Sequence, residues 1–249
     1  MMSRMRSIPR TAVAIAALAA VAGCAKGPPP YGVEQPTALP GDVRAVWAIA
    51  PALNLSGVRT IDPLLQADLL YQQLQSVGGV TVIPVNRVAE VYAALRIDKV
   101  RSVEQANLVC DLLGCDGLVV PTVTAYDPYD PPKMGASLQV FLKPGGYARP
   151  RNIDPRLLAR SATPGGDESL PAGPPPDFEQ SVGMFDAANG SVRERLFAYA
   201  AGRHDPVGPL GKKEYLVNMD RYSGFVYHEL IVQLLQSPRL SGPRRATQG

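Results

Sequence analysis

The clearest hydrophobic pattern in the chain lies between Ser102 and Tyr126. Apolar residues recur in its first half at spacings of three and four, the period of one buried helix face. These residues are Ala106, Val109, Cys110 and Leu113. Ser102 and Gln105 have the spacing of a capping box at the start of a helix, and Gly114 stands where a left-handed C-cap would end it. The pattern predicts a helix that ends at Gly114.

A strand is predicted directly after this helix. Residues 118–124 are mostly β-branched and uncharged, which is typical of a strand buried on both faces. Val119 and Val123 should be fully buried there. Pro121 lies between them and has no N–H for a sheet ladder, so we expect it on an edge strand or at a bulge. Helix, glycine and buried strand together indicate an α/β unit.

Residues 43–85 predict two more strands with a helix between them. Val43 to Ala52 is apolar on both faces, as in an interior strand, and residues 54–57 (Asn-Leu-Ser-Gly) have the composition of a turn that ends it. Asp62 and Pro63 suit the N-cap and first position of a helix, which Gly78-Gly79 should end. Its apolar stripe is Ala67, Leu70, Leu74 and Val77. Val80 to Val85 reads as the second strand.

Another helix, capped by Asn86 and running to about Leu95, completes the order β-α-β-α-α-β. The predicted fold class is α/β (α+β), with a mixed sheet covered by helices, a Pro/Gly-rich insert and a C-terminal amphipathic helix. We assign residues 43–126 to the core of the domain, 127–182 to the insert, 183–237 to the strand and helices that complete the domain, and 238–249 to a flexible tail.

The insert differs sharply in composition, with 11 prolines and 6 glycines among its 56 residues. Ser137 to Leu142 has the pattern of a strand, whereas Asn152 to Phe178 lacks sustained periodicity and predicts a long loop or partial disorder. Such an insert is either a tolerated surface excursion or a partner-binding loop. Order should return at Ser181 to Asp186, as a strand at the edge of the sheet.

Two helices are predicted near the C-terminus. Ser191 and Glu194 have capping-box spacing before a helix whose apolar residues are Val192, Leu196, Tyr199 and Ala200. The last helix is amphipathic, should cover the sheet and should end before Pro238. Its apolar face comprises Met219, Tyr222, Val226, Leu230 and Leu234.

The N-terminus has the three parts of a secretory signal: a basic segment to Arg10, an apolar segment to Val21, and small residues up to Cys24. The signal occupies residues 1–23 and is too short for a membrane-spanning helix. Val21-Ala22-Gly23-Cys24 resembles a bacterial lipobox, in which the cysteine is acylated and held to a bilayer; the alternative is an ordinary signal with an incidental cysteine. Residues 24–42 then form the lipidated start and a proline-rich tether.

Removing the signal changes the charge of the protein. The chain has 25 basic and 22 acidic side chains, and three arginines lie within residues 1–23, so the mature chain has 22 of each. A neutral protein lacks the positive field that nucleic acids or anionic membrane surfaces attract. No nucleic-acid partner is therefore predicted, and the membrane should be reached through the lipid anchor alone.

The segments AIAPALNLSG, DPLLQADLLYQQL, VTVIPVNR and LLGCDGLVVPTVT resemble the periplasmic domain of the curli-secretion lipoprotein (CsgG) family. The same layout occurs in the lipoprotein activators of penicillin-binding proteins (LpoB) and in polysaccharide-export lipoproteins. The resemblance spans residues 44–126 and rests on packing motifs; Pro121 replaces the family's usual glycine. It implies a periplasm-facing lipoprotein, with the outer membrane favoured because Ala25, and not Asp, follows Cys24.

Motifs for catalysis or metal binding fail on their spacing. His228-Glu229 begins an H-E-x-x-H zinc pattern, but Val232 stands in place of the second histidine. His228 is expected on a helix surface or partly packed, and His204 in a solvated loop. Residues 208–213 have the wrong spacing for a phosphate-binding loop. No cofactor, metal or catalytic residue is predicted, and an enzyme is not expected.

Cys110 and Cys115 admit two interpretations. They can be small buried hydrophobic residues, one on the helix face and one before the strand. They can also form a disulfide across the helix C-cap, which an exported location permits. Their C-x₄-C spacing is not that of a redox C-x-x-C motif.

Three functions of different classes remain. The preferred one is a non-enzymatic accessory or scaffold in envelope assembly or export, which binds envelope or secretion proteins; a homo-oligomer is a further candidate assembly. The second is a subunit of an oligomeric outer-membrane secretion pore, which requires spanning hairpins; only Gly135 to Leu142 approaches that pattern. The third is an envelope hydrolase with an unrecognised site. A fold alone does not choose among them.

Overall fold

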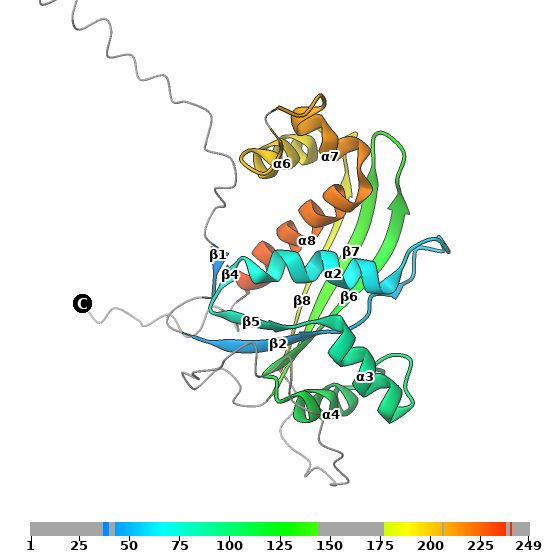
Figure 1. The fold of residues 1–249 in the computed structure, drawn as a ribbon, viewed down its shortest axis with the longest axis vertical. Coiled ribbons are helices and arrows are strands. Elements are labelled where there is room, and N and C mark those ends of the chain that lie inside the picture. The colour runs from blue at the N-terminus through cyan, green and yellow to red at the C-terminus, as the bar shows by residue number, and fades with distance from the viewer. Residues whose placement is uncertain (1–36, 40–42, 144–176, 206, 238–239, 241–249) are drawn as a thin grey trace, which may run out of the picture.

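The computed structural model describes residues 37–39, 43–143, 177–205, 207–237 and 240 of the chain (Figure 1). A six-stranded mixed sheet forms its centre. Across the sheet the strands are β5 (Val80–Ile83), β2 (Ala45–Ile49), β6 (Gly117–Asp127), β7 (Lys133–Leu142) and β8 (Asp177–Asp186), and the short β3 (Leu53–Asn54) pairs with β6 beyond the end of β2. β5, β2, β3 and β6 run parallel, while β7 and β8 are antiparallel to their neighbours. The predicted α/β class with a mixed sheet is confirmed.

Helices cover both faces of this sheet. They are α2 (Pro63–Gln75), α3 (Val85–Leu95), α4 (Val103–Leu113), α6 (Gly190–Ala200), α7 (Glu214–Val217) and α8 (Met219–Leu235), with a 3₁₀ turn, η1, at Gly211–Lys213. Successive residues of a strand point to opposite faces, and β2 shows the consequence. Trp47 packs in the core under α2 and α8, whereas Val46 and Ala48 pack under α3 and α4. Figure 1 shows α2 and α8 side by side on one face of the sheet.

The helix-to-strand unit that dominates the sequence folds as its signals indicate. The Ser102 hydroxyl accepts the N–H of Gln105, and Gly114 ends α4 at φ +67°. The Gln105 side chain accepts the N–H of Arg101 and not that of Ser102, so only half of the predicted capping box forms. The four predicted apolar residues of α4 are all buried.

Three predicted helix ends are wrong by two residues each. Asp62 and Pro63 begin α2 as expected, but the helix ends at Gln75, because Val77–Gly78 forms strand β4 beside β1 (Thr37–Ala38). Pro84, and not Asn86, is the N-cap of α3. Asn189, and not Ser191, is the N-cap of α6, since its side chain accepts the N–H of Ser191.

The predicted turn at residues 54–57 overlaps an unpredicted strand at its first residue. Leu53 and Asn54 form β3 and pair with Thr122 and Val123. The turn begins at Asn54, whose carboxamide oxygen accepts the N–H of Ser56. The sheet therefore contains a strand, β3, that is too short to be predicted from the sequence pattern.

Pro121 occupies an interior strand, so the prediction of an edge or bulge is wrong. The carbonyl oxygens of Val119 and Val123 accept N–H groups from Ala50 and Leu55, on the side of β2 and β3. Because backbone groups alternate in direction along a strand, the missing N–H of Pro121 faces the same side. There β2 has ended its pairing at Val119 and β3 has not begun. The proline costs no ladder bond because it lies at this gap.

Val119 and Val123 are 1% and 0% exposed, as predicted. We expect Val119→Ala to lower the free energy of unfolding by about 1–3 kcal/mol, from lost apolar burial and an unfilled cavity. Urea denaturation followed by circular dichroism measures this change. An unchanged midpoint would remove Val119 from the core.

The C-terminal helix covers the sheet as predicted and packs against β7 and β8. It is buried on more than one face because α2 packs along its other side. Among its fully buried residues, Tyr227 donates its hydroxyl to Gln66 of α2 at 2.9 Å. Burial raises the pKa of Tyr227 above its ordinary value, with a smaller contribution from Tyr126.

The predicted insert contains strand β7 and the beginning of β8. Ser137 to Leu142 lies in β7, which starts earlier, at Lys133. The edge strand predicted over Ser181 to Asp186 exists but starts at Asp177, so Phe178 belongs to β8 and not to a loop. Residues 144–176, which include most of the predicted loop, lie outside the described residues.

Candidate functional site

The predicted lipidation site, Cys24, lies outside the described residues. Within them, no helix has both the length and the apolar character needed to cross a bilayer. The anchor at Cys24 stays a prediction.

Cys110 and Cys115 are brought together and carry free thiols in the structure. Cys110 lies in the last turn of α4, Cys115 follows the glycine cap, and both are buried. The N–H of Cys115 donates to the carbonyl of Cys110 at 3.0 Å. The side-chain hydrogen bond with Cys115, and then burial, raise the pKa of the Cys110 thiol well above its ordinary value.

We expect both thiols to be alkylated slowly by iodoacetamide in the folded protein and rapidly after unfolding, because both are buried and the raised pKa of Cys110 disfavours its reactive thiolate. Mass spectrometry of intact protein counts the modified cysteines under each condition. A quantitative Cys110–Cys115 linkage in a non-reducing peptide map would contradict this expectation.

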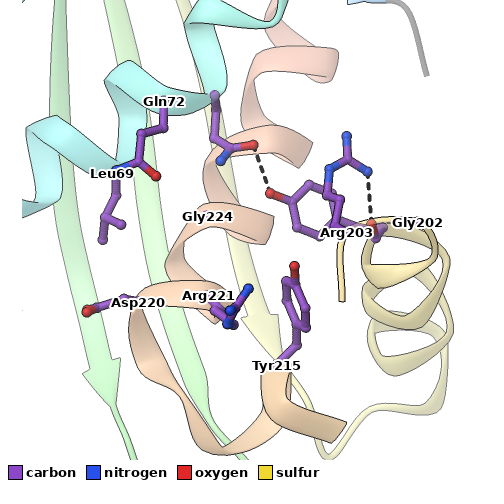
Figure 2. Close-up of a pocket in the computed structure, with 10 residues that line it drawn as sticks. Leu69, Gln72, Gly202, Arg203, Tyr215, Asp220, Arg221 and Gly224 are labelled. Atoms are coloured by element: carbon purple, nitrogen blue, oxygen red, sulfur yellow. Dashed lines mark hydrogen bonds between the residues drawn. The ribbon is translucent and has the colours of Figure 1, made fainter. Parts of the chain in front are cut away.

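A polar cleft of about 480 Å³ lies where α2, α6, α7 and α8 meet (Figure 2). The residues that line it are Leu69, Gln72, Gln73, Tyr199, Gly202, Arg203, Tyr215, Asp220, Arg221 and Gly224. Gly224 allows its walls to approach, because a Cβ there would lie 3.3 Å from the Gln73 carboxamide nitrogen and 3.5 Å from the Tyr199 hydroxyl.

Tyr199 links the walls of this cleft. Its hydroxyl donates to the Gln73 carboxamide oxygen of α2 at 2.8 Å, and its backbone carbonyl accepts from the Arg203 guanidinium at 2.8 Å. The same guanidinium lies 4.2 Å from the centre of the Tyr199 ring, a cation–π geometry. The ring centre of His228, on α8, lies 4.9 Å from the ring centre of Tyr199.

Arg221 organises the opposite wall. Its Nε donates to the Glu214 carboxylate at 2.7 Å, and its guanidinium lies 5.4 Å from the centre of the Tyr215 ring. Burial raises the pKa of Tyr215, while its hydrogen bond with Arg221 acts in the opposite direction. Tyr215 therefore stays protonated at neutral pH and offers a hydroxyl to a bound group.

The charges around the cleft balance, since Arg203, Arg221 and Asp220 line it and Glu214 accepts a hydrogen bond from Arg221. A balanced site offers hydrogen bonds and aromatic faces and lacks the concentrated field of an anion site. Among the described residues, no group of three or more His, Cys, Asp or Glu side chains is placed to hold a metal. The cleft is suited to binding polar groups.

We expect Tyr199→Phe to lower the free energy of unfolding by about 0.5–1.5 kcal/mol, because it removes the hydrogen bond that joins α6 to α2. Gln73 keeps access to water through the cleft, which limits the loss. Thermal unfolding followed by circular dichroism measures it. Tyr71→Phe is the control, because among the described residues the Tyr71 hydroxyl has no hydrogen bond to the cleft. An equal loss in this variant would show that the bond between Tyr199 and Gln73 is not responsible.

The sequence analysis did not predict this cleft. The cleft residues come from four helices and the turn after α6, at separations of up to 155 positions, between Leu69 and Gly224. No local motif could have united them.

The prediction that His204 is solvated is wrong. Its side chain is half-buried, with Nδ1 at 2.9 Å from the carbonyl oxygen of Ala200. His228 is half-buried, as expected of a partly packed histidine.

A second surface is the apolar stripe of β8, formed by Phe178, Val182 and Met184, which are 40%, 56% and 55% exposed. The stripe lies on the sheet face opposite α8. Its register pairs Met184 with Gly135 and Phe178 with Phe141 of β7. A Cβ on Gly135 would lie only 2.8 Å from the terminal methyl of Met184, so the glycine leaves room for the methionine to lie across β7.

Comparisons with known proteins give partial likenesses. No family model matches the chain, and no curated protein matches its sequence. Lipoprotein GNA1162 from Neisseria meningitidis is 18% identical, over 41% of this chain and 73% of that one, with a TM-score of 0.32. The LpoB C-terminal domain from Escherichia coli is 11% identical, over 41% and 74%, with a TM-score of 0.33. Protein CT253 from Chlamydia trachomatis is 14% identical, over 77% and 96%, with a TM-score of 0.36.

These TM-scores are all below 0.5, so the likenesses assign no function to this chain. The sequence resemblance to the curli-secretion family stays a prediction.

Proposed function

We propose that this protein is a periplasm-facing envelope lipoprotein, anchored through Cys24 and working as a non-enzymatic accessory that binds other envelope proteins. The lipobox pattern supports the anchor, and Ala25 favours the outer membrane. The observation that carries the binding role is the apolar stripe of β8.

The stripe is unusual for a solvent-facing strand. Solvent-facing positions of antiparallel sheets are commonly polar, yet three of the even-numbered positions of β8 carry large apolar side chains at 40–56% exposure. Clustered exposed apolar groups with polar surroundings mark interaction surfaces. Gln180 lies within the same row and adds a polar group to it.

The polar cleft supports binding in preference to catalysis. Its arginines already contact Tyr199, Glu214 and Tyr215, an arrangement that presents fixed donors and ring faces. Such groups recognise polar side chains or backbone of a partner.

The segment that came closest to a membrane-spanning hairpin, Gly135 to Leu142, is part of β7. That strand pairs with β6 on one side and β8 on the other, and most of its residues are buried. A segment that holds the middle of a sheet is not available to enter a bilayer, which favours the accessory role over the pore.

Photo-crosslinking in intact cells tests the proposal. We expect a benzoylphenylalanine residue at position 184 to give discrete crosslinked bands with an envelope protein, because the side chain of Met184 lies on the binding surface. The same residue at position 60, where exposed Thr60 precedes α2 on another part of the molecule, is the matched control. Equal labelling patterns from both positions, or none from position 184, would contradict the proposal.

A further inference from the structure

We infer that the partner binds as an extended segment that adds one more strand to the sheet, beside β8. This inference rests on the proposed function and specifies how binding occurs. Its starting point is that β8 ends the sheet: within the described part of the chain, β7 is the one strand that pairs with it.

The direction of the backbone groups in β8 follows from two hydrogen bonds. The N–H of Ala187 donates to the carbonyl of Pro132, which continues the β7–β8 ladder, and the N–H of Lys143 donates to the carbonyl of Asp116, which continues the β6–β7 ladder. Backbone groups alternate in direction along a strand. Both bonds show that the odd-numbered residues of β8 direct their backbone N–H and C=O groups toward β7. Gln180, Val182 and Met184 therefore direct their N–H and C=O groups toward the open edge.

The same three residues carry exposed side chains. A strand added at this edge would form backbone hydrogen bonds with Gln180, Val182 and Met184, and its residues directly opposite them would point to the same face. Apolar side chains at those alternate positions would lie against Val182 and Met184. Edge and stripe thus belong to one binding surface.

The intervening residues of the added strand would face the other side. There a groove of about 360 Å³ lies between β8 and α8. Its polar side chains include Arg195 and Glu229, paired at 2.7 Å, with Gln233 and Gln236 beside them. This groove favours polar side chains. The expected partner segment alternates apolar and polar residues.

Natural sheets usually protect a long edge with proline, lysine or a bulge. The sequence of β8, DFEQSVGMFD, contains neither proline nor lysine, and its pairing with β7 runs over ten residue pairs without a register shift. A straight edge of this length that lacks proline, lysine and a bulge is a template for another strand.

Charge argues for a foreign segment over a second copy. The strand carries Asp177, Glu179 and Asp186 and no basic residue. An antiparallel pair of β8 strands centred on Val182 would place each Asp186 opposite Phe178 of the other copy, so neither an apolar pair nor a charge pair would form at either end of the ladder. A partner segment with lysine or arginine at its ends would complement both ends of β8.

The test uses the full lipoprotein in detergent and a synthetic peptide, Lys-Val-Thr-Val-Thr-Val-Thr-Val-Lys. We expect the peptide to slow hydrogen exchange at the amides of Gln180, Val182 and Met184, measured by mass spectrometry at single-residue resolution. Amides that face β7 should be slow with or without it. Gln180→Pro removes one outward donor, and Gln180→Ala keeps it. The proline variant should bind the peptide more weakly than the alanine variant, with a dissociation constant higher by a factor of up to about ten.

Equal thermal unfolding of the two variants confirms that the proline leaves the fold intact. Equal peptide affinities, or no protection of the three amides, would overturn strand addition. So would a concentration-dependent dimer that Gln180→Pro abolishes in sedimentation, since the occupant would then be a second copy. If crosslinking from position 184 to an envelope protein persists in Gln180→Pro but is lost in Val182→Ser, the accessory role stands and only the strand-addition mode fails.

Discussion

Replacing Trp47 by alanine is expected to lower the free energy of unfolding by about 3–5 kcal/mol, the range for large aromatic truncations in a core. Trp47 is fully buried in β2, the strand between β5 and β6, and lies in the core under α2 and α8. A Cβ on Gly117 would lie 3.2 Å from its indole Cδ1, so the ring packs directly on the neighbouring strand. A loss of this size is a large part of the 5–15 kcal/mol that stabilises a typical domain.

Circular dichroism in urea should follow this change, because Trp47 is the single tryptophan of the chain and its removal abolishes the usual fluorescence signal. Leu55→Ala serves as the control: Leu55 is 67% exposed, and its truncation should change stability by less than about 0.5 kcal/mol. A Trp47→Ala loss no larger than the control would place the indole outside the core.

Replacing Cys24 by alanine is expected to abolish acylation and with it the stable attachment of the protein to the membrane. Residues 24–249 carry 22 basic and 22 acidic side chains, so no general surface charge would hold them to the bilayer once the acyl chains are missing. The protein should then accumulate as uncleaved precursor or leave the detergent phase for the aqueous phase. Detergent phase separation with immunoblotting measures the distribution.

Ser3→Ala, within the signal segment, is the matched control and should leave the partition unchanged. Wild-type protein found entirely in the aqueous phase would contradict the lipid anchor.

Local signals explain which parts of the fold the sequence could predict. Asp62 with Pro63, and Ser102 with Gly114, start or end helices through backbone bonds a few residues away, so their patterns are readable without tertiary structure. Strand β3 is different, because two residues at Leu53–Asn54 become a strand only through pairing with β6. The prediction for Pro121 was wrong for the same reason, because the gap between β2 and β3 that accommodates it is a tertiary feature.

The candidate surfaces were less readable. The beginning of β8 was not predicted because a proline-rich run, up to Pro176, precedes it directly. An alternation of four or five residues is also a weak signal for a strand. That Val182 and Met184 stay exposed depends on which sheet face α3 and α4 cover. In the cleft, the hydrogen bond from Tyr199 to Gln73 joins α6 to α2, which lie far apart in the chain. Neither surface follows from spacing alone.

Two double variants that remove similar exposed apolar groups from different places test whether the β8 stripe binds the partner. Val182→Ser with Met184→Ser alters the stripe of β8, and Leu55→Ser with Val217→Ser alters residues that are 67% and 54% exposed elsewhere. The measurement is the amount of envelope protein that co-purifies with each lipoprotein after crosslinking of intact cells, quantified by mass spectrometry. We predict a loss of at least about tenfold for the β8 variant and wild-type recovery for the control. Equal recovery from both variants would show that the β8 stripe does not bind the partner.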